Sequence, residues 1–236
     1  MKRISLIVPC LNEEEAIPAF KQEIDRVFKE CLEGYAPELI FVDDGSTDRS
    51  LEMIKKMAEH SPEVKFISFS RNFGKEAAIY AGLEAATGDY AAVMDVDLQD
   101  PPSLLPDMLK AIEKEGYDCA GTRRVTRQGE PLLRSFFARA FYKTIHQISD
   151  TRIVDGARDY KLMTRPVLEA LLSLKEYNRF SKGLYEWVGF RTKWFEYENV
   201  ERVAGETEWS FFKQFLYYIE GIVAFSTAPL ALASII

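Results

Sequence analysis

The alternation of short β-branched runs with helical patterns constrains the fold most. We predict strands over Ile4 to Val8, Leu39 to Val42, Val64 to Phe69 and Tyr90 to Met94. Helical patterns separate them, over Ala16 to Cys31, up to His60 and over Lys75 to Ala86. This alternation is typical of βαβ units and a parallel sheet, so the sequence predicts an α/β fold.

The second half of the chain carries weaker patterns. We predict strands over Asp118 to Gly121, Asp159 to Met163 and Thr192 to Tyr197, and a helix over Pro166 to Leu174. A chain of 236 residues can bury one substantial core. We therefore interpret residues 1–208 as one domain and residues 209–236 as an appended segment.

Charge and cysteine content exclude several classes of protein. The formal net charge is −7, which argues against a nucleic-acid binder, because phosphate backbones are held by clustered Lys and Arg. The three cysteines, Cys10, Cys31 and Cys119, are far apart and have no metal-ligand spacing. This usage fits a reducing cytoplasm rather than a disulfide framework or a zinc site.

Polar clusters follow the predicted strands, and the sharpest runs from Asp95 to Asp100. In open α/β sheets ligands bind outside the carboxyl ends of strands, so these clusters should share one crevice. Asp95 and Asp97, with the amide oxygen of Gln99, could face a hard divalent cation that neutralises a departing nucleoside diphosphate. The pattern is weak alone, because Asp100 before Pro101 could simply start a helix.

The other strand-end clusters are individually ambiguous. Asp43 and Asp44 offer carboxylates to a ribose or a base, but the same segment could form a turn, with Asp48 capping the next helix. Glu13 could instead lie in the first turn of a helix, where an acidic side chain interacts favourably with the helix dipole. The segment from Arg71 to Lys75 could bring positive charge to a diphosphate or form an ordinary basic loop.

Two segments of the second half are unusual in composition. Six basic residues and a single acid lie between Arg123 and Lys143, a local reversal in an acidic chain. Trp209 to Tyr218 is rich in aromatics, and Gly221 to Ile236 carries no charge. That uncharged run is slightly shorter than the stretch of about 20 apolar residues that a membrane-spanning helix needs. A buried terminal helix is therefore the alternative. We favour a membrane anchor and expect the native chain to continue beyond Ile236.

Taken in order, five motifs resemble the inverting family 2 glycosyltransferases: Pro9 to Glu14, Asp43 to Ser46, Arg71 to Lys75, Asp95 to Asp100 and Gly121 to Arg123. Further segments, including Asp159 to Met163 and Phe225 to Leu230, resemble the polyprenyl-phosphate glycosyltransferases, which include dolichol-phosphate mannose synthase and bacterial undecaprenyl-phosphate glucosyltransferases. The resemblance covers essentially the whole chain. It implies a GT-A fold with a mostly parallel sheet flanked by helices, a Mg²⁺ or Mn²⁺ ion, a UDP- or GDP-sugar donor and a polyprenyl phosphate acceptor.

The resemblance also implies residue roles. Pro9, Glu13, Asp43 and Asp44 would hold the nucleoside, Lys75 and Asp95 the donor, Asp97 and Gln99 the metal, and Arg123 and Arg134 the acceptor phosphate. Asp159 matches the usual candidate for a catalytic base, although it could instead position Arg123 or a sugar hydroxyl. The motif Gln-x-x-Arg-Trp of processive members is absent from the sequence, so one sugar per cycle is expected.

These features predict a hexosyltransferase with its catalytic domain on the cytoplasmic side of the plasma or inner membrane. The oligomeric state stays open, with a homo-oligomer allowed. One alternative is a family 2 enzyme that acts on a soluble or polymeric saccharide. A non-catalytic nucleotide-sugar-binding module at a membrane is the other. Trp187 and Trp194 are predicted to pack in the core rather than stack on sugars.

Overall fold

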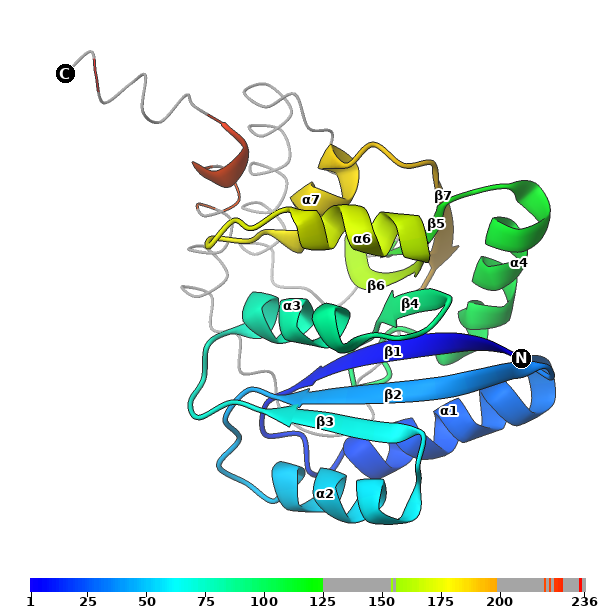
Figure 1. The fold of residues 1–236 in the computed structure, drawn as a ribbon, viewed down its shortest axis with the longest axis vertical. Helices are drawn as coiled ribbons and strands as arrows, with labels where there is room; N and C mark the ends of the chain where they lie inside the picture. The colour runs from blue at the N-terminus through cyan, green and yellow to red at the C-terminus, as the bar shows by residue number, and fades with distance from the viewer. Residues whose placement is uncertain are drawn as a thin grey trace.

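The computed structural model describes residues 1–124, 154, 156–198, 219, 221, 223–226 and 234. These residues form one seven-stranded sheet in the order β3-β2-β1-β4-β6-β5-β7 (Figure 1). Its strands are β1 (Lys2–Cys10), β2 (Tyr35–Asp43), β3 (Val64–Ser68), β4 (Tyr90–Val93), β5 (Cys119–Arg124), β6 (Ala157–Thr164) and β7 (Thr192–Tyr197). The helices are α1 (Ile17–Cys31), α2 (Ser50–His60), α3 (Lys75–Ala85), the short 3₁₀ helix η1 (Pro102–Leu104), α4 (Leu105–Glu115), α6 (Arg165–Ser173) and α7 (Ser181–Trp187).

One strand of the sheet runs against the others. β1 pairs in parallel with β2 and β4, and β2 pairs in parallel with β3. β6 is antiparallel to its neighbours β4 and β5, whereas β7 is parallel to β5. The predicted mostly parallel sheet is confirmed. The reversal of β6 brings its amino end to the edge where β1 to β4 end.

Helices cover both faces of the sheet and bury two hydrophobic clusters. Successive residues of β2 point to opposite faces, so Phe41 packs with α1, α2 and α4, whereas Ile40 packs with α3, α6 and α7. Both side chains are fully buried. The central strands therefore read as continuous apolar runs, as expected for a sheet covered on both faces.

The predicted strands and helices are present, with shifted ends. β1 and β2 are longer than predicted, and α2 begins at Ser50 with Arg49 at its N-cap, not Asp48. Asp48 still accepts the Ser50 N–H at 2.9 Å. The sequence did not predict α7, because a helix of seven residues is too short to show a clear period.

The prediction that Trp187 packs in the core is wrong. Its side chain is 60% exposed, and its ring lies 6.4 Å from that of Phe225. Arg134, the segment from Trp209 to Tyr218, most of 221–236 and the domain boundary at 208 lie outside the described residues. Among the residues that are described, no helix is both long and apolar enough to span a membrane.

Glu38 is a buried acid near the amino ends of the strands. It accepts hydrogen bonds from Lys65 Nζ at 2.6 Å and from the Thr87 N–H at 2.9 Å and hydroxyl at 2.6 Å. The hydroxyl of Ser5, its register partner on β1, also donates to it. Burial alone would raise the pKa of Glu38, but these hydrogen bonds outweigh burial and lower it to about 2.

We predict that Glu38→Gln lowers the free energy of unfolding by about 2 to 3 kcal/mol at pH 7. A carboxylate with a depressed folded pKa contributes stability above its unfolded pKa near 4.5 and loses it as pH falls toward about 2. Urea melts between pH 7 and pH 2.5 should therefore show less acid sensitivity in the variant. Glu52→Gln, which removes an exposed partner of Lys56, is the matched control. Equal acid sensitivity of Glu38→Gln and wild type would contradict the assignment.

Candidate active site

The loops that follow β1 and β2 are joined by hydrogen bonds. Asn12 accepts the Thr47 N–H at 2.8 Å and donates its own N–H to Ser46 Oγ at 3.0 Å. The Glu13 N–H donates to Ser50 Oγ at 2.8 Å. Asn12 has φ of 54°, a left-handed conformation that Asn tolerates. The end of β1, with Pro9, and Glu13 therefore lie against the loop that follows β2, as the sequence predicts.

Acidic side chains at the end of β2 connect the loop that follows β2 to the loop that follows β3. Asp43 is buried and accepts the Ser46 N–H at 3.2 Å. Asp44 accepts the N–H groups of Phe73 and Gly74 at 2.7 and 2.9 Å. Burial raises the pKa of Asp44, although the two N–H donors oppose that effect.

Gly45 allows the loops after β2 and β3 to approach. Its φ is +76°, and a Cβ there would lie 2.6 Å from the carbonyl carbon of Arg71. Only glycine fits this contact without a backbone shift. The segment that leads to Lys75 is thereby placed beside the two acids of β2.

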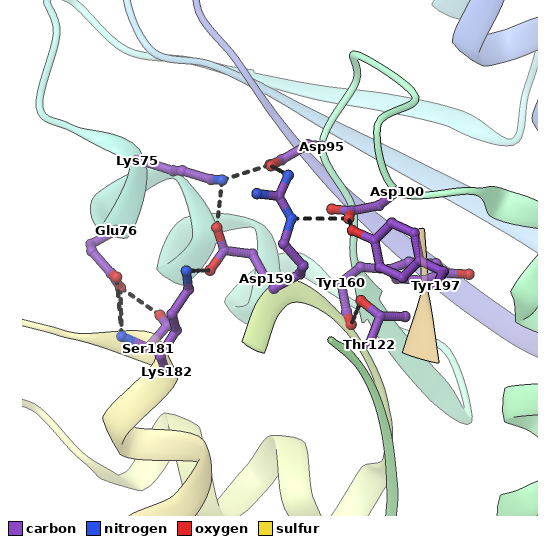
Figure 2. A network of polar contacts seen from close by, with 11 residues as sticks. Lys75, Glu76, Asp95, Asp100, Thr122, Asp159, Tyr160, Ser181, Lys182 and Tyr197 are labelled. Atoms are coloured by element: carbon purple, nitrogen blue, oxygen red, sulfur yellow. Dashed lines mark hydrogen bonds and ion pairs between the residues drawn. The ribbon is translucent and has the colours of Figure 1, made fainter. Parts of the chain in front are cut away.

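Lys75, the first residue of α3, lies between two carboxylates from other elements (Figure 2). Its Nζ is 2.7 Å from Asp95 Oδ1 and 2.5 Å from Asp159 Oδ2. Lys182, from α7, approaches the other oxygen of Asp159 at 3.9 Å. The structure thus joins Lys75, Asp95 and Asp159, here called the triad, which the sequence places far apart.

The antiparallel pairing of β4 and β6 explains why these carboxylates meet. Val93 pairs with Lys161, so extending the register by two residues on each strand puts Asp95 opposite Asp159. Burial acts to raise the pKa of Asp159, but the charges of Lys75 and Lys182 outweigh it and hold that pKa below its ordinary value. Burial likewise acts to lower the pKa of Lys75, and the charges of Asp159 and Asp95 raise it overall. Lys75 and Asp159 are therefore both charged at neutral pH.

The turn after β4 carries the predicted metal ligands. Asp97 is 7% exposed, and its Oδ1 accepts the Gln99 N–H at 3.1 Å. Leu98 between them has φ of 58°, which is uncommon for a bulky residue. A carboxylate and an amide on one turn supply hard oxygen donors. Within the described part of the chain, no three His, Cys, Asp or Glu side chains are grouped closely enough to hold a metal ion by themselves.

Sequence reasoning missed three polar contacts that surround this turn and the triad. Arg158 Nε lies 3.0 Å from Asp100 Oδ1, and the Tyr197 hydroxyl donates to the same carboxylate. Ser181 donates its N–H to Glu76 at 3.0 Å. Asp100 ends the acidic cluster that the sequence did single out, and Arg158 precedes Asp159, but the two lie 58 positions apart and no local pattern reveals their pairing.

The predicted acceptor arginines are only partly described. Arg123 lies near the end of β5 and forms an ion pair with Glu196 of β7, its register partner. Its side chain is 39% exposed. Arg134 lies outside the described residues.

Comparison with known proteins gives a consistent result. The profile of Glycosyl transferase family 2 matches residues 5–172. A putative glycosyltransferase of Bacillus subtilis, CsbB, is 44% identical over 97% of this chain and 68% of its own length. The prophage bactoprenol glucosyl transferase homolog of Escherichia coli is 42% identical over 97% of this chain and 74% of its own length. The bactoprenol glucosyl transferase of Shigella phage SfV is also 42% identical, over 97% of this chain and 73% of its own.

Solved structures support the fold. Glucosyl-3-phosphoglycerate synthase from Mycobacterium tuberculosis, in complex with Mn²⁺, UDP-glucose and phosphoglyceric acid, superposes with a TM-score of 0.58 at 19% identity, over 94% of this chain and 79% of that one. A mannosyltransferase from Pyrobaculum calidifontis, in complex with GDP-mannose and Mn²⁺, gives a TM-score of 0.55 at 21% identity, over 86% and 57%. The architecture is GT-A-like, and the chain belongs to glycosyl transferase family 2.

Proposed function

We propose that this protein transfers a single sugar, with inversion, from a nucleotide-diphospho-sugar to a polyprenyl phosphate at the cytoplasmic face of a membrane. The observation that carries the proposal is the ion-paired triad of Lys75, Asp95 and Asp159 beside the oxygen donors of Asp97 and Gln99. Relatives named bactoprenol glucosyl transferase, at 42% identity over 97% of the chain, support a polyprenyl phosphate acceptor and make glucose the first sugar to test.

The donor side is assigned to the loops after β1, β2 and β3. Pro9, Glu13, Asp43 and Asp44 would bind the nucleoside, because they lie along the hydrogen-bonded loops described above. Lys75 follows directly and begins α3, so its charge adds to the positive end of that helix. An ammonium at a helix N-terminus suits a donor diphosphate.

The residues present fit a divalent cation. Asp97 and Gln99 would hold it, because Mg²⁺ and Mn²⁺ prefer oxygen ligands and often share them with substrate phosphates. When bound, the ion would neutralise charge on the departing nucleoside diphosphate. Asp95 would remain paired with Lys75, which keeps the carboxylate and the ammonium in fixed positions beside the donor.

The acceptor requires little base catalysis. A phosphate monoester has a second pKa near 6 and is mostly a dianion at neutral pH. One of its oxygens forms a bond to the anomeric carbon as the bond to the leaving diphosphate breaks, and no proton must move. The depressed pKa of Asp159, caused by Lys75 and Lys182 against the opposing effect of burial, makes this carboxylate a weak base. We therefore assign Asp159 to electrostatic positioning of Lys75 within the catalytic centre.

The first test of this function is transfer of labelled sugar to undecaprenyl phosphate in detergent, with UDP-glucose, GDP-mannose and UDP-N-acetylglucosamine and with Mn²⁺ or Mg²⁺. We predict that Asp97→Asn lowers turnover about 100-fold, because it removes a charged oxygen donor. Asp107→Asn, an exposed acid in the first turn of α4, is the control. Full activity of Asp97→Asn at low metal concentration would contradict the metal assignment.

The same assay separates the alternative functions. Transfer only to a soluble saccharide would favour an enzyme with a soluble acceptor. Absence of any donor turnover would favour the non-catalytic binding module.

We predict that Arg123→Ala raises the KM for polyprenyl phosphate about tenfold and changes the KM for the donor little, because a guanidinium binds a phosphate through charged hydrogen bonds. Arg134→Ala should act in the same direction. Glu196→Gln is the matched control, since it removes the carboxylate partner of Arg123 and keeps the guanidinium. A rise in the donor KM alone would place Arg123 on the other side of the site.

We predict that the full chain floats with liposomes that contain anionic lipid, and that a variant without residues 209–236 floats less. Residues 209–218 are rich in aromatics and residues 221–236 carry no charge, a composition that suits a membrane interface. Lys and Arg near anionic headgroups add about 1 kcal/mol each. Recovery of both forms in the soluble fraction, with neither floating with the lipid, would contradict membrane binding. Retained thermal stability of the shortened form would show that the comparison concerns folded protein.

A further inference from the structure

The turn formed by residues 95–100 contains a backbone conformation that its own sequence does not favour. Leu98 adopts φ of 58°, although bulky residues rarely enter the left-handed region. Such a conformation is strained and persists only where the surrounding structure holds it. Part of the holding force is local, because Leu98 packs against the hydrophobic core and the Gln99 N–H bonds to Asp97.

Arg158 contacts both ends of the same turn. Its Nε lies 3.0 Å from Asp100 Oδ1, and its Nη2 lies 3.9 Å from Asp95 Oδ2. The guanidinium is planar and stiff, so the two contacts restrict the relative positions of the two carboxylates. Asp97 and Gln99 lie within the stretch that these contacts span.

Tyr197 also contacts Asp100, the carboxylate that pairs with Arg158 Nε. The hydroxyl of Tyr197, at the end of β7, donates to the same oxygen of Asp100 that Arg158 contacts. The Asp100 side chain is fully buried, and within the described residues its other oxygen has no hydrogen-bond partner. Removal of either partner from a buried carboxylate of this kind is strongly destabilising, because the charge is then left less well compensated.

We infer that Arg158, Asp100 and Tyr197 form a clamp that holds the turn in the conformation that presents Asp97 and Gln99 to the cation. Arg158 is then a positioning residue, which acts through Asp95 and Asp100 and not by contact with the reacting atoms. The inference rests on the proposed function in one respect, because it takes Asp97 and Gln99 as metal ligands. A purely structural ion pair would hold β6 to the turn without changing the affinity for metal.

The test measures Mn²⁺ binding from the loss of the free-ion EPR signal, with UDP or GDP at fixed concentration and no acceptor. Arg158→Gln should weaken Mn²⁺ binding about tenfold, the range seen when outer partners of metal ligands are removed. Hydrogen exchange of the 95–100 backbone should become faster in the same variant. Arg165→Gln, which removes an arginine paired with Glu169 on α6, should change neither measurement.

A double-mutant cycle tests the role of strain. Glycine adopts a positive φ readily, so Leu98→Gly should make the turn less dependent on the clamp. The loss of Mn²⁺ affinity caused by Arg158→Gln should therefore be smaller in the Leu98→Gly background. Additive effects of the two substitutions would overturn the claim that the clamp holds a strained turn.

The remaining outcomes separate this inference from the proposed function. If wild type binds Mn²⁺ and Arg158→Gln binds it equally well, the clamp is overturned and the proposed function stands. If wild type binds no Mn²⁺ with either nucleotide, both are overturned. Should Arg158→Gln fail to fold, Tyr197→Phe removes a single hydroxyl and should weaken Mn²⁺ binding about threefold. Unchanged binding in that variant would overturn the clamp.

Discussion

The ion pairs of Lys75 with Asp95 and Asp159 are the interaction on which the rest of the site depends. Two carboxylates opposite each other on adjacent strands repel, and burial makes the repulsion stronger. A single ammonium within 2.7 Å of one and 2.5 Å of the other compensates both. Removal of Lys75 would leave these two partly buried carboxylates with only the longer contacts of Asp159 to Lys182 and of Asp95 to Arg158, each at 3.9 Å. Such a loss costs more than the ion pairs contribute when they are intact. The position of α3 and the pairing of β4 with β6 are therefore coupled through this side chain.

Buried charge at the two ends of the strands serves different purposes. Near the amino ends, Glu38 is surrounded by donors from Ser5, Lys65 and Thr87, which hold its pKa near 2 against the effect of burial. Near the carboxyl ends, Lys75 keeps 28% of its side chain exposed, so an incoming anion can compete for it. The first arrangement stabilises the sheet, whereas the second leaves charges available to a ligand.

Helix α7 connects the polar centre to the described part of the C-terminal segment. Its first residues face the site, since Ser181 binds Glu76 and Lys182 approaches Asp159. One residue later, a Cβ on Gly183 would lie 2.3 Å from the ring of Phe225, so only glycine allows this contact. A displacement of Phe225 would therefore change the packing of α7, the helix that supplies Lys182. This link was invisible in the sequence, because α7 is too short to carry a periodic pattern.

The sequence by itself determined the α/β alternation, the family and the two acid clusters at the ends of β2 and β4. These features are local: a strand of Val, Ile and Phe followed by Asp reads the same in any context. It also singled out Lys75 and Asp159 as site candidates, through their resemblance to the family. The donor role of Lys75 remains a proposal, and Asp159 is proposed to position Lys75 rather than to act as a base.

Only the tertiary structure decided which of these residues meet. The reversal of β6 sets Asp159 opposite Asp95, and a parallel β6 would have sent Asp159 to the other edge of the sheet. Arg158 and Asp100 are 58 positions apart, and Tyr197 is 97 positions from Asp100. Long-range ion pairs of this kind depend on strand order and register, which one-dimensional periodicity does not encode. The exposure of Trp187 was likewise decided by packing, because the neighbours that would cover a side chain come from elements distant in the chain.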